Sequence, residues 1–327
     1  LSSGDVSMFD TVTETGASMF ASDLDLIPGS GRFVMSFRDA GRIRLVDIEA
    51  FLAGAGAGAE TNSAGGGGGT ADAESDEEVV AESDEEVVAE TDEEVVAESS
   101  EEVVEETIEE TLEPPIFPLP AGVTELLTGG VTLGLCRVAD DGSTAIFFST
   151  LLGSRTIGLL DLMADEPALG FVPLHKEVRV VEIDPSSRFG VLYHQASGQT
   201  ALPGDDFETL IEKSNGYSVL DIASSYVQPF ITDHEPKDLV FLPEYDRMLV
   251  LLPDPAAIDH RVEVVDFLRF LATNHPLYAR PLSIQAFKGE ARAVILEEHV
   301  SGRLTLVDAV EDETESVTGF HLNAEQN

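Results

Sequence analysis

One short pattern recurs along the chain and restricts its possible folds more than any other feature. A run of strand-forming residues that ends in aspartate occurs six times, at residues 6–10, 43–47, 157–161, 217–221, 262–266 and 304–308. The last four of these aspartates stand 60, 45 and 42 residues apart. A period of roughly 40 to 50 residues is typical of propeller blades and solenoids. Because one such unit cannot bury its apolar side alone, the units must pack on one another.

A second pattern precedes five of these aspartates by about twenty residues. It is a turn rich in Gly, Pro, Asp and Ser between two strand-forming runs, at residues 26–35, 140–147, 183–192, 242–251 and 287–296. Such turns join antiparallel strands. The strand after the turn is nearly all apolar, which indicates burial on both faces. Each unit therefore predicts an inner strand, an apolar core strand, the Asp-ended strand and a weaker outer strand, which together make one β-propeller blade.

The first copy of the pattern resembles a known repeat. Residues 6–11 read Val-Ser-Met-Phe-Asp-Thr. This is similar to the YVTN-type β-propeller repeats of secreted and periplasmic bacterial proteins, in which a strand of the form Val-Ser-Val-Ile-Asp-Thr recurs. As a repeat architecture, the resemblance covers residues 1–50 and 120–323. It implies an all-β propeller located in the periplasm, on the outer surface or outside a bacterial cell, but no particular activity.

The repeats set the expected domain organisation. Residues 1–52 are expected to form the first part of the propeller and residues 119–327 its remaining blades, with residues 53–118 inserted between them. The chain begins inside a blade and then completes five, so we expect an open ring with further residues upstream. A seven-bladed parent ring is the preferred prediction. Six blades, or a self-contained ring of five, are the alternatives.

The insertion has two compositions. Residues 53–70 are mostly Gly and Ala, which predicts a flexible linker. An acidic octad then recurs from Ala73, Ala81, Ala89 and Ala97. At ~100° per residue, eight residues of a helix advance about 80° beyond two turns, so the octad valines form no single apolar stripe. The like charges also repel one another, and we expect this acidic segment to be disordered.

The octad carboxylates are candidates for weak, multivalent Ca²⁺ binding. The first two octads supply Asp76, Glu77, Glu78, Asp84, Glu85 and Glu86. A specific calcium site needs ligands that alternate around a sharp glycine turn, and the octads have no such turn. A solubilising spacer is the favoured interpretation, and attraction of basic partners is a further alternative.

The formal net charge of −44 restricts the partners of the chain. Residues 72–113 hold 21 of the 62 acidic residues and no basic one, and the remaining 41 still outnumber the 18 Lys and Arg residues. Such a fold repels phosphate backbones and anionic headgroups, so we predict no nucleic-acid partner. No apolar run approaches the ~20 residues of a transmembrane helix. The single cysteine, Cys136, is expected to be a buried apolar residue.

The recurrent aspartates are interpreted as structural residues. They are Asp10, Asp47, Asp161, Asp221, Asp266 and Asp308. A carboxylate at a strand end can accept the backbone N–H groups of the following turn. The same placement in every repeat favours this architectural role over the alternative, an acidic ring of metal ligands.

The seven histidines show no compact metal-ligand spacing such as His-Glu-x-x-His. His194 and His299 are the most site-like, although a structural or surface role is favoured for both. Residues 233–235 read Asp-His-Glu and residues 259–260 read Asp-His. Both segments enter loops that can share one face of the ring, which leaves a composed metal site open as an interpretation.

No catalytic or cofactor-binding residue is predicted. The chain has no Gly-x-Ser-x-Gly elbow, no Walker loop and no dinucleotide fingerprint. The favoured hypothesis is a non-enzymatic binding or scaffold propeller of the bacterial envelope or exterior, which holds a protein or a glycan. The alternative, implied by propeller analogy alone, is a lactonase-like hydrolase with a divalent metal ion in the central channel. The oligomeric state stays undetermined at this level.

Overall fold

The fold consists of β-sheets that repeat along the chain. The computed structural model describes residues 19–58, 119–194, 202–256 and 258–319. These residues form twenty β-strands in five four-stranded antiparallel sheets, and within each sheet the strands lie side by side in chain order. A four-stranded meander of this kind is a propeller blade, so the expected all-β propeller fold with four-stranded blades is confirmed.

The blades are numbered along the chain. Blade 1 consists of β1 (Asp23–Ile27), β2 (Arg32–Phe37), β3 (Arg42–Asp47) and β4 (Val123–Leu127). Blade 2 consists of β5 (Leu135–Val138), β6 (Thr144–Phe148), β7 (Thr156–Asp161) and β8 (Leu169–Pro173). Blade 3 consists of β9 (Val178–Ile183), β10 (Phe189–His194), β11 (Asn215–Asp221) and β12 (Tyr226–Thr232). Blade 4 consists of β13 (Asp238–Leu242), β14 (Arg247–Leu252), β15 (His260–Asp266) and β16 (Leu271–Leu277). Blade 5 consists of β17 (Pro281–Ala286), β18 (Arg292–Glu297), β19 (Arg303–Asp308) and β20 (Glu313–Thr318).

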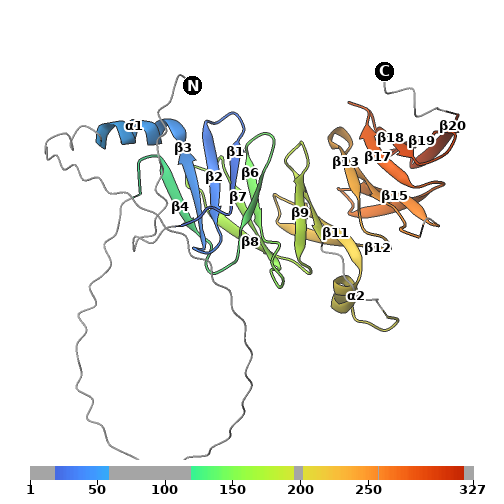
Figure 1. Ribbon diagram of the computed structural model, residues 1–327, viewed down its shortest axis with the longest axis horizontal. Helices are drawn as coiled ribbons and strands as arrows, with labels where there is room; N and C mark the ends of the chain where they lie inside the picture. Colours follow the sequence, from blue (N-terminus) through green and yellow to red (C-terminus); the bar gives the residue numbers. More distant parts are fainter. Residues whose placement is uncertain (1–18, 59–118, 195–201, 257, 320–327) are drawn as a thin grey trace, which may run out of the picture.

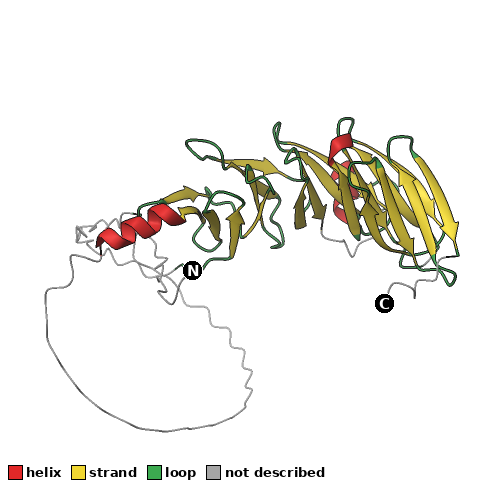
Figure 2. Ribbon diagram, turned by 90° about the horizontal axis from the view of Figure 1, so that it is seen from above, coloured by secondary structure: helices red, strands yellow, loops and turns green. Residues whose placement is uncertain are grey.

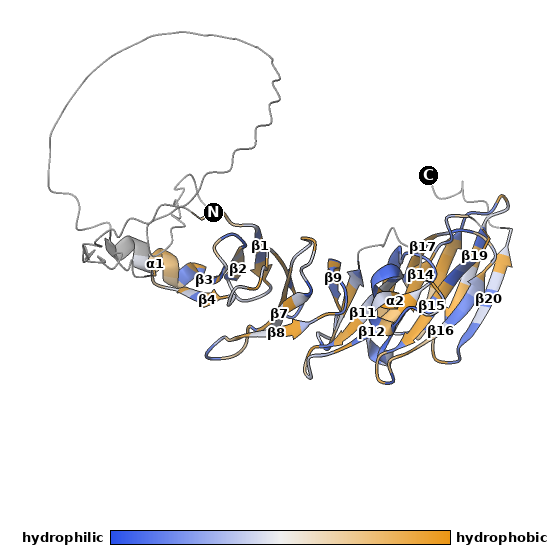
Figure 3. Ribbon diagram, turned by 90° about the horizontal axis from the view of Figure 1, so that it is seen from below, coloured by the Kyte–Doolittle hydropathy of each residue, from blue (hydrophilic) through white to orange (hydrophobic). Residues whose placement is uncertain are grey.

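The second strand of a blade lies in the core because both of its faces are apolar. All six residues of β10 are buried, as are the last five residues of β14. Alternate side chains of a strand point to opposite faces of its sheet, so such a strand packs on the blades before and after it. Figure 3 shows the result, with hydrophobic residues along much of β14 and β15 and more polar residues along the outermost strand β20.

Neighbouring blades contact one another through their first strands and through shared apolar clusters. β1 lies against β5, β5 against β9, and β13 against β17. Four clusters of buried residues each combine side chains from two consecutive blades. The blades follow one another along the molecule, and blades 1 and 5 lie at opposite ends of its longest axis (Figures 1 and 2). Over the residues described, the array of blades is therefore open.

The boundary of the insertion differs from the sequence prediction. Residues 53–58, expected to be part of a flexible linker, form the second half of helix α1 (Ile48–Gly58). The helix is held at its beginning, where Asp47 Oδ1 accepts the N–H of Ala50 at 2.9 Å. The returning chain passes close to the helix at Gly122, where a Cβ atom would lie 2.7 Å from that of Ala50. Tertiary packing thus overrides the low helix propensity of glycine.

Two other boundaries also need correction. Residues 119–127, expected in the later blades, contain β4, which completes blade 1, so the insertion separates the third and fourth strands of one blade. Residues 202–206 lead into helix α2 (Phe207–Lys213), which the sequence patterns do not predict. Asp206 caps this helix by accepting the N–H of Thr209 at 2.8 Å. A 3₁₀ turn, η2 (Pro243–Tyr245), precedes β14.

Some predictions fall on residues outside the described part of the chain. These are the partial blade at residues 6–10 with Asp10, the linker at residues 59–70 and the acidic octads. The number of blades in a closed ring likewise stays a prediction. Of the helices described, none is long and apolar enough to span a membrane.

Five of the six recurrent aspartates are described, and each ends the third strand of its blade. Each accepts at least one backbone N–H of the following turn, at 2.8 to 3.2 Å, from Ala50, Met163, Ser224, Leu268, Arg269, Val310 and Glu311. In blades 1, 4 and 5 the residue directly opposite the aspartate is an arginine, namely Arg32, Arg247 and Arg292. These are the contacts expected of structural turn residues, and that role can be tested by substitution.

Replacing Asp266 by Ala should destabilise the fold by about 1–2 kcal/mol, because the N–H groups of Leu268 and Arg269 lose their acceptor. Asp266→Asn keeps an acceptor oxygen and should cost less. Urea denaturation followed by circular dichroism measures both. The matched control is Asp165→Ala, because Asp165 is exposed and has no hydrogen-bond partner among the described residues. Equal stability of the two alanine variants would contradict the structural role.

Candidate functional site

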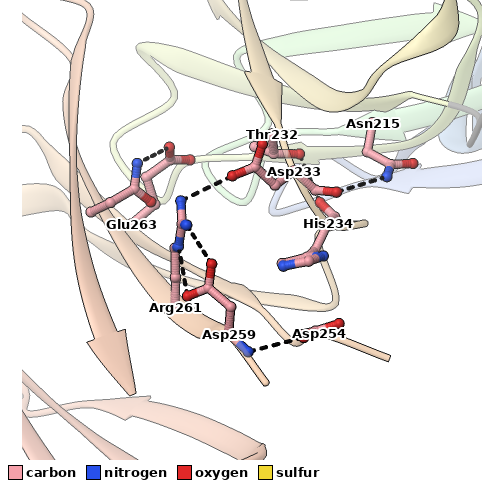
Figure 4. Close-up of polar contacts among 9 residues, drawn as sticks. Asn215, Thr232, Asp233, His234, Asp254, Asp259, Arg261 and Glu263 are labelled. Carbon is pink, nitrogen blue, oxygen red and sulfur yellow. Dashed lines mark hydrogen bonds and ion pairs between the residues drawn. The ribbon is translucent and has the colours of Figure 1, made fainter. Parts of the chain in front are cut away.

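A cleft of about 490 Å³ lies at one end of blades 3 to 5. It is lined mainly by the loop from Asp233 to Lys237, which joins β12 to β13, and by residues 253–255 after β14. Arg179 of β9, Asn215 of β11 and Arg280, which precedes β17, complete the lining. Because the loops of three blades meet here, residues far apart in sequence come together (Figure 4).

The carboxylates of the cleft are already satisfied within the protein. Glu235 forms an ion pair with Arg179, and Asp233 accepts from Arg261 at 3.0 Å. Asp254 accepts three backbone N–H groups, from Ala256 at 2.7 Å and from Ile258 and Asp259 at 2.9 Å each. These backbone hydrogen bonds, that from Ile258 foremost, lower the pKa of Asp254. Each of these three carboxylates is therefore held in place by a partner within the protein.

Arg261 ties two segments of the site together. Its guanidinium contacts Asp233 from the β12–β13 loop and Asp259 from the loop before β15 (Figure 4). Its hydrogen bonds lower the pKa of Asp259. A guanidinium presents several donors in a rigid plane, so a single arginine can hold two carboxylates in a fixed arrangement.

Two cations at the cleft have no carboxylate partner among the described residues. Lys237 Nζ donates only to backbone carbonyl groups, those of Leu282 at 3.3 Å and Pro281 at 3.5 Å. The side chain of Arg280 is exposed and makes no hydrogen bond or ion pair in the described part of the chain. Both groups can therefore donate to a ligand.

His234 adds a buried ring nitrogen, Nε2, that lacks a hydrogen-bond partner among the described residues. His234 lines both the cleft and an adjoining cavity of about 50 Å³ that contains Glu263. Glu263 is only 4% exposed and accepts from Tyr217 Oη at 2.6 Å and Asn274 Nδ2 at 3.3 Å. Burial raises the pKa of Glu263.

The predicted metal ligands do not assemble into a metal site. The structure brings Asp233, His234 and Asp259 to the same end of the fold, but both carboxylates contact Arg261. His260 is buried, and its Nδ1 accepts the N–H of Asp254 at 2.9 Å. Among the described residues, no group of three or more His, Cys, Asp or Glu could hold a metal ion.

The two histidines singled out in the sequence lie outside the cleft. His194 is buried in blade 3, where its Nε2 contacts Ser218 Oγ at 2.7 Å and its Nδ1 contacts the carbonyl oxygen of Glu177 at 3.1 Å. Burial lowers the pKa of His194 to about 4. His299 accepts the N–H of Ser301 at 3.2 Å in an exposed turn of blade 5. Both contacts are those of structural residues.

Lys237 and Arg280 are residues of the cleft that the sequence patterns do not single out. One signal was available for Lys237, because the chain has only four lysines and this one follows the Asp-His-Glu segment by two residues. Of the others, Lys176 is buried against the carbonyl oxygen of Ser214 and Lys213 is paired with Asp205. Arg280 carries no comparable local signal. Cys136 is buried as expected, and burial raises the pKa of its thiol.

Comparisons with known proteins do not assign the chain to a family. No family model matches the chain, and no curated protein matches its sequence. Among solved structures, the chain is similar to the Dos1 propeller, with 9% identity over 95% of this chain and 62% of that one and a TM-score of 0.42. It is similar to the dihydro-heme d1 dehydrogenase NirN, with 10% identity over 96% of this chain and 50% of that one and a TM-score of 0.47.

A third similar structure is Kuenenia stuttgartiensis hydrazine synthase, with 9% identity over 99% of this chain and 70% of that one and a TM-score of 0.41. The chain thus spans half of NirN and less than two thirds of the Dos1 chain. Likenesses at these scores carry no argument about activity. The propeller assignment rests on the five sheets themselves.

Acidification should destabilise the fold through His194. Its pKa in the folded chain, about 4, lies below the ~6.5 of an unfolded chain, so the unfolded state takes up the proton first as the pH falls. The stabilisation is present above pH ~6.5 and is lost towards pH 4. Relative to a His194→Gln variant, the wild type should lose about 3 kcal/mol of unfolding free energy between pH 7 and pH 4. Urea denaturation across this range measures the difference, and parallel profiles would refute it.

Weak Ca²⁺ binding by the octads stays a prediction, because these residues lie outside the described part. Replacing Glu77, Glu78, Glu85 and Glu86 by Gln in the full chain should reduce the number of bound Ca²⁺ ions, as measured by isothermal titration calorimetry. The control carries the same number of Glu→Gln changes at exposed positions of the blades, namely Glu166, Glu244, Glu290 and Glu298. Unchanged stoichiometry in the octad variant would contradict Ca²⁺ binding by these glutamates of the first two octads.

Proposed function

We propose that the chain is a non-enzymatic binding propeller whose cleft at blades 3 to 5 holds an anionic group of a protein or glycan partner. One observation carries this proposal. The carboxylates of the cleft have partners within the protein, whereas Lys237 and Arg280 have no carboxylate partner among the described residues. A ligand carboxylate, sulfate or phosphate supplies what these two cations lack.

The dimensions and the fixed charges of the cleft suit the binding of a ligand. A volume of about 490 Å³ accommodates one or two side chains or sugar units. Asp254 and Asp259 have lowered pKa values and are fixed by the hydrogen bonds they accept, so they are weak bases. Groups held in this way orient a ligand better than they move protons.

The proposed cellular location rests on the repeat resemblance alone. The resemblance of residues 6–11 to YVTN-type repeats supports a location in the periplasm, on the outer surface or outside a bacterial cell. A propeller in the envelope that binds proteins or glycans is consistent with a cleft built from loops of several blades, since loops carry function on a rigid scaffold.

The double variant Lys237→Ala/Arg280→Ala should bind acidic ligands ten- to a hundredfold more weakly than the wild type, because two charge-assisted hydrogen bonds are lost. Two probes suit the test, a uronate-bearing glycan array and an immobilised poly-glutamate peptide read by biolayer interferometry. Both use the full chain at 0.15 M salt. The two probes separate the glycan source of the anion from the protein source.

The matched control is Arg269→Ala/Lys288→Ala, which removes the same charge from exposed positions outside the cleft lining. It should bind like the wild type. If the wild type binds neither probe, or if both double variants bind alike, the proposed role of the cleft is wrong.

A further inference from the structure

A second cleft, of about 450 Å³, lies at one end of blades 1 and 2. Two segments line it, residues 38–41 in the turn from β2 to β3 and residues 127–132 at the connection from β4 to β5. The segments are tied together, because the N–H of Thr128 donates to the carbonyl oxygen of Gly41 at 3.0 Å. None of these residues lines the cleft of blades 3 to 5, so the two clefts are separate.

Arg38 is the cation of this second cleft. Most arginines of the chain form an ion pair with a carboxylate. The guanidinium of Arg38 forms no hydrogen bond or ion pair with any described residue, and its Nε atom is buried without a partner. In a chain with 62 acidic and 18 basic residues, a guanidinium that no described carboxylate neutralises keeps its donors available to a ligand.

The fold leaves room for this guanidinium at Gly134. A Cβ atom at Gly134 would lie 2.1 Å from Nε and 2.7 Å from Nη2 of Arg38. The backbone of Gly134 is held on both sides, because its N–H donates to the carbonyl oxygen of Phe148 and its carbonyl oxygen accepts from Ser36 Oγ, both at 3.0 Å. Its φ angle is not in the left-handed region, so glycine is needed here for space. Since Gly134 precedes β5, Arg38 extends from blade 1 towards blade 2.

Thr128 supplies a second unsatisfied group. It lines the cleft, it is 0% exposed, and its Oγ1 atom has no hydrogen-bond partner among the described residues. Both of its backbone groups are paired, the N–H with Gly41 and the carbonyl oxygen with the N–H of Val131 at 3.0 Å. A buried hydroxyl without a partner is destabilising, so native proteins usually provide one. A Cβ atom on Gly129 or Gly130 would meet nothing within 4 Å, so the segment after Thr128 borders open space.

We infer that the second cleft binds an anionic group, a carboxylate, sulfate or phosphate, through the guanidinium of Arg38 and the hydroxyl of Thr128. A planar guanidinium donates two parallel hydrogen bonds to such a group, and a hydroxyl can donate a third. The volume of the cleft leaves space for the side chain or sugar unit that carries the anion. This site uses none of the cations of the cleft of blades 3 to 5, so it does not rest on the proposed function.

Asp39 also lines the cleft, and its side chain is exposed. Its charge repels a free anion, so the affinity for inorganic anions should be modest. The same carboxylate can accept a hydrogen bond from a hydroxyl or N–H group next to the anion of a larger ligand. Asp39→Asn should therefore strengthen the binding of inorganic sulfate, which has no such donor.

An NMR titration of the full chain tests the inference. Sodium sulfate, sodium phosphate or sodium glucuronate replaces sodium chloride at constant ionic strength, so that the three probes separate the possible sources of the anion. The Nε–H signal of Arg38, assigned by its loss in Arg38→Lys, should shift to saturation with at least one probe. The backbone N–H signals of Gly129 and Gly130 report binding in variants that lack the Arg38 signal.

Two substitutions separate a ligand contact from a structural role. Arg38→Gln should weaken binding about tenfold or more, because the charge and the paired donors are lost. Thr128→Val should weaken it about threefold and leave the stability to urea unchanged or higher, because the hydroxyl has no partner within the described protein. Gly134→Ala keeps the charge but displaces the guanidinium, so it should also weaken binding, and it replaces Arg38→Gln if that variant does not fold.

The matched controls are Arg137→Gln and Thr124→Val, at exposed positions outside the lining of both clefts. Both should bind the probes like the wild type, as should Lys237→Ala/Arg280→Ala, which tests the other cleft separately. The inference is wrong if no probe shifts the signals of Arg38, Gly129 and Gly130, or if Arg38→Gln and Arg137→Gln bind alike. A loss of stability in Thr128→Val without a change in binding would likewise assign the hydroxyl a structural role.

Discussion

Burial of both faces of the second strand in blades 1 to 4 is the constraint on which the rest of the fold depends. Every residue of β10 is buried, which is possible only if another sheet covers each side of blade 3. A blade of this composition cannot be stable alone, because both of its apolar faces would remain in water. The stacking of blades in chain order and the placement of loops at the blade ends both follow from this need to bury both faces.

The two ends of each blade serve different purposes because only one end is held by the aspartate turns. Asp266 closes the turn from β15 to β16, at the end of the blade where β14 begins. The cleft lies at the opposite end, where β14 ends and β15 begins, and there the connecting loops vary in length and composition. Fixed turns at one end leave the other free to carry a site, as is usual for loops on a rigid scaffold.

The blades could be predicted from the sequence because their signals are local. Turn residues followed by an apolar strand and an Asp-ended strand identify each blade without knowledge of its neighbours. Helix α1 could not be predicted in the same way, since residues 53–58 have the composition of a linker and the helix packs on a segment that returns after the insertion. The cleft was only partly predictable. The Asp-His-Glu segment was recognised, but its pairing with Arg261 and the availability of Arg280 depend on tertiary contacts.

An anion site in a chain of net charge −44 is physically reasonable, because repulsion by the charge of the whole chain and attraction to two nearby cations act over different distances. At physiological ionic strength the screening length is about 8 Å, so most of the negative charge of the chain is screened from the cleft. A contact of about 3 Å with Lys237 or Arg280 is screened far less. The carboxylates that line the cleft are already held by Arg179, Arg261 and backbone N–H groups, which offset part of their charge. Local pairing of this kind lets an acidic propeller present two usable cations to a ligand.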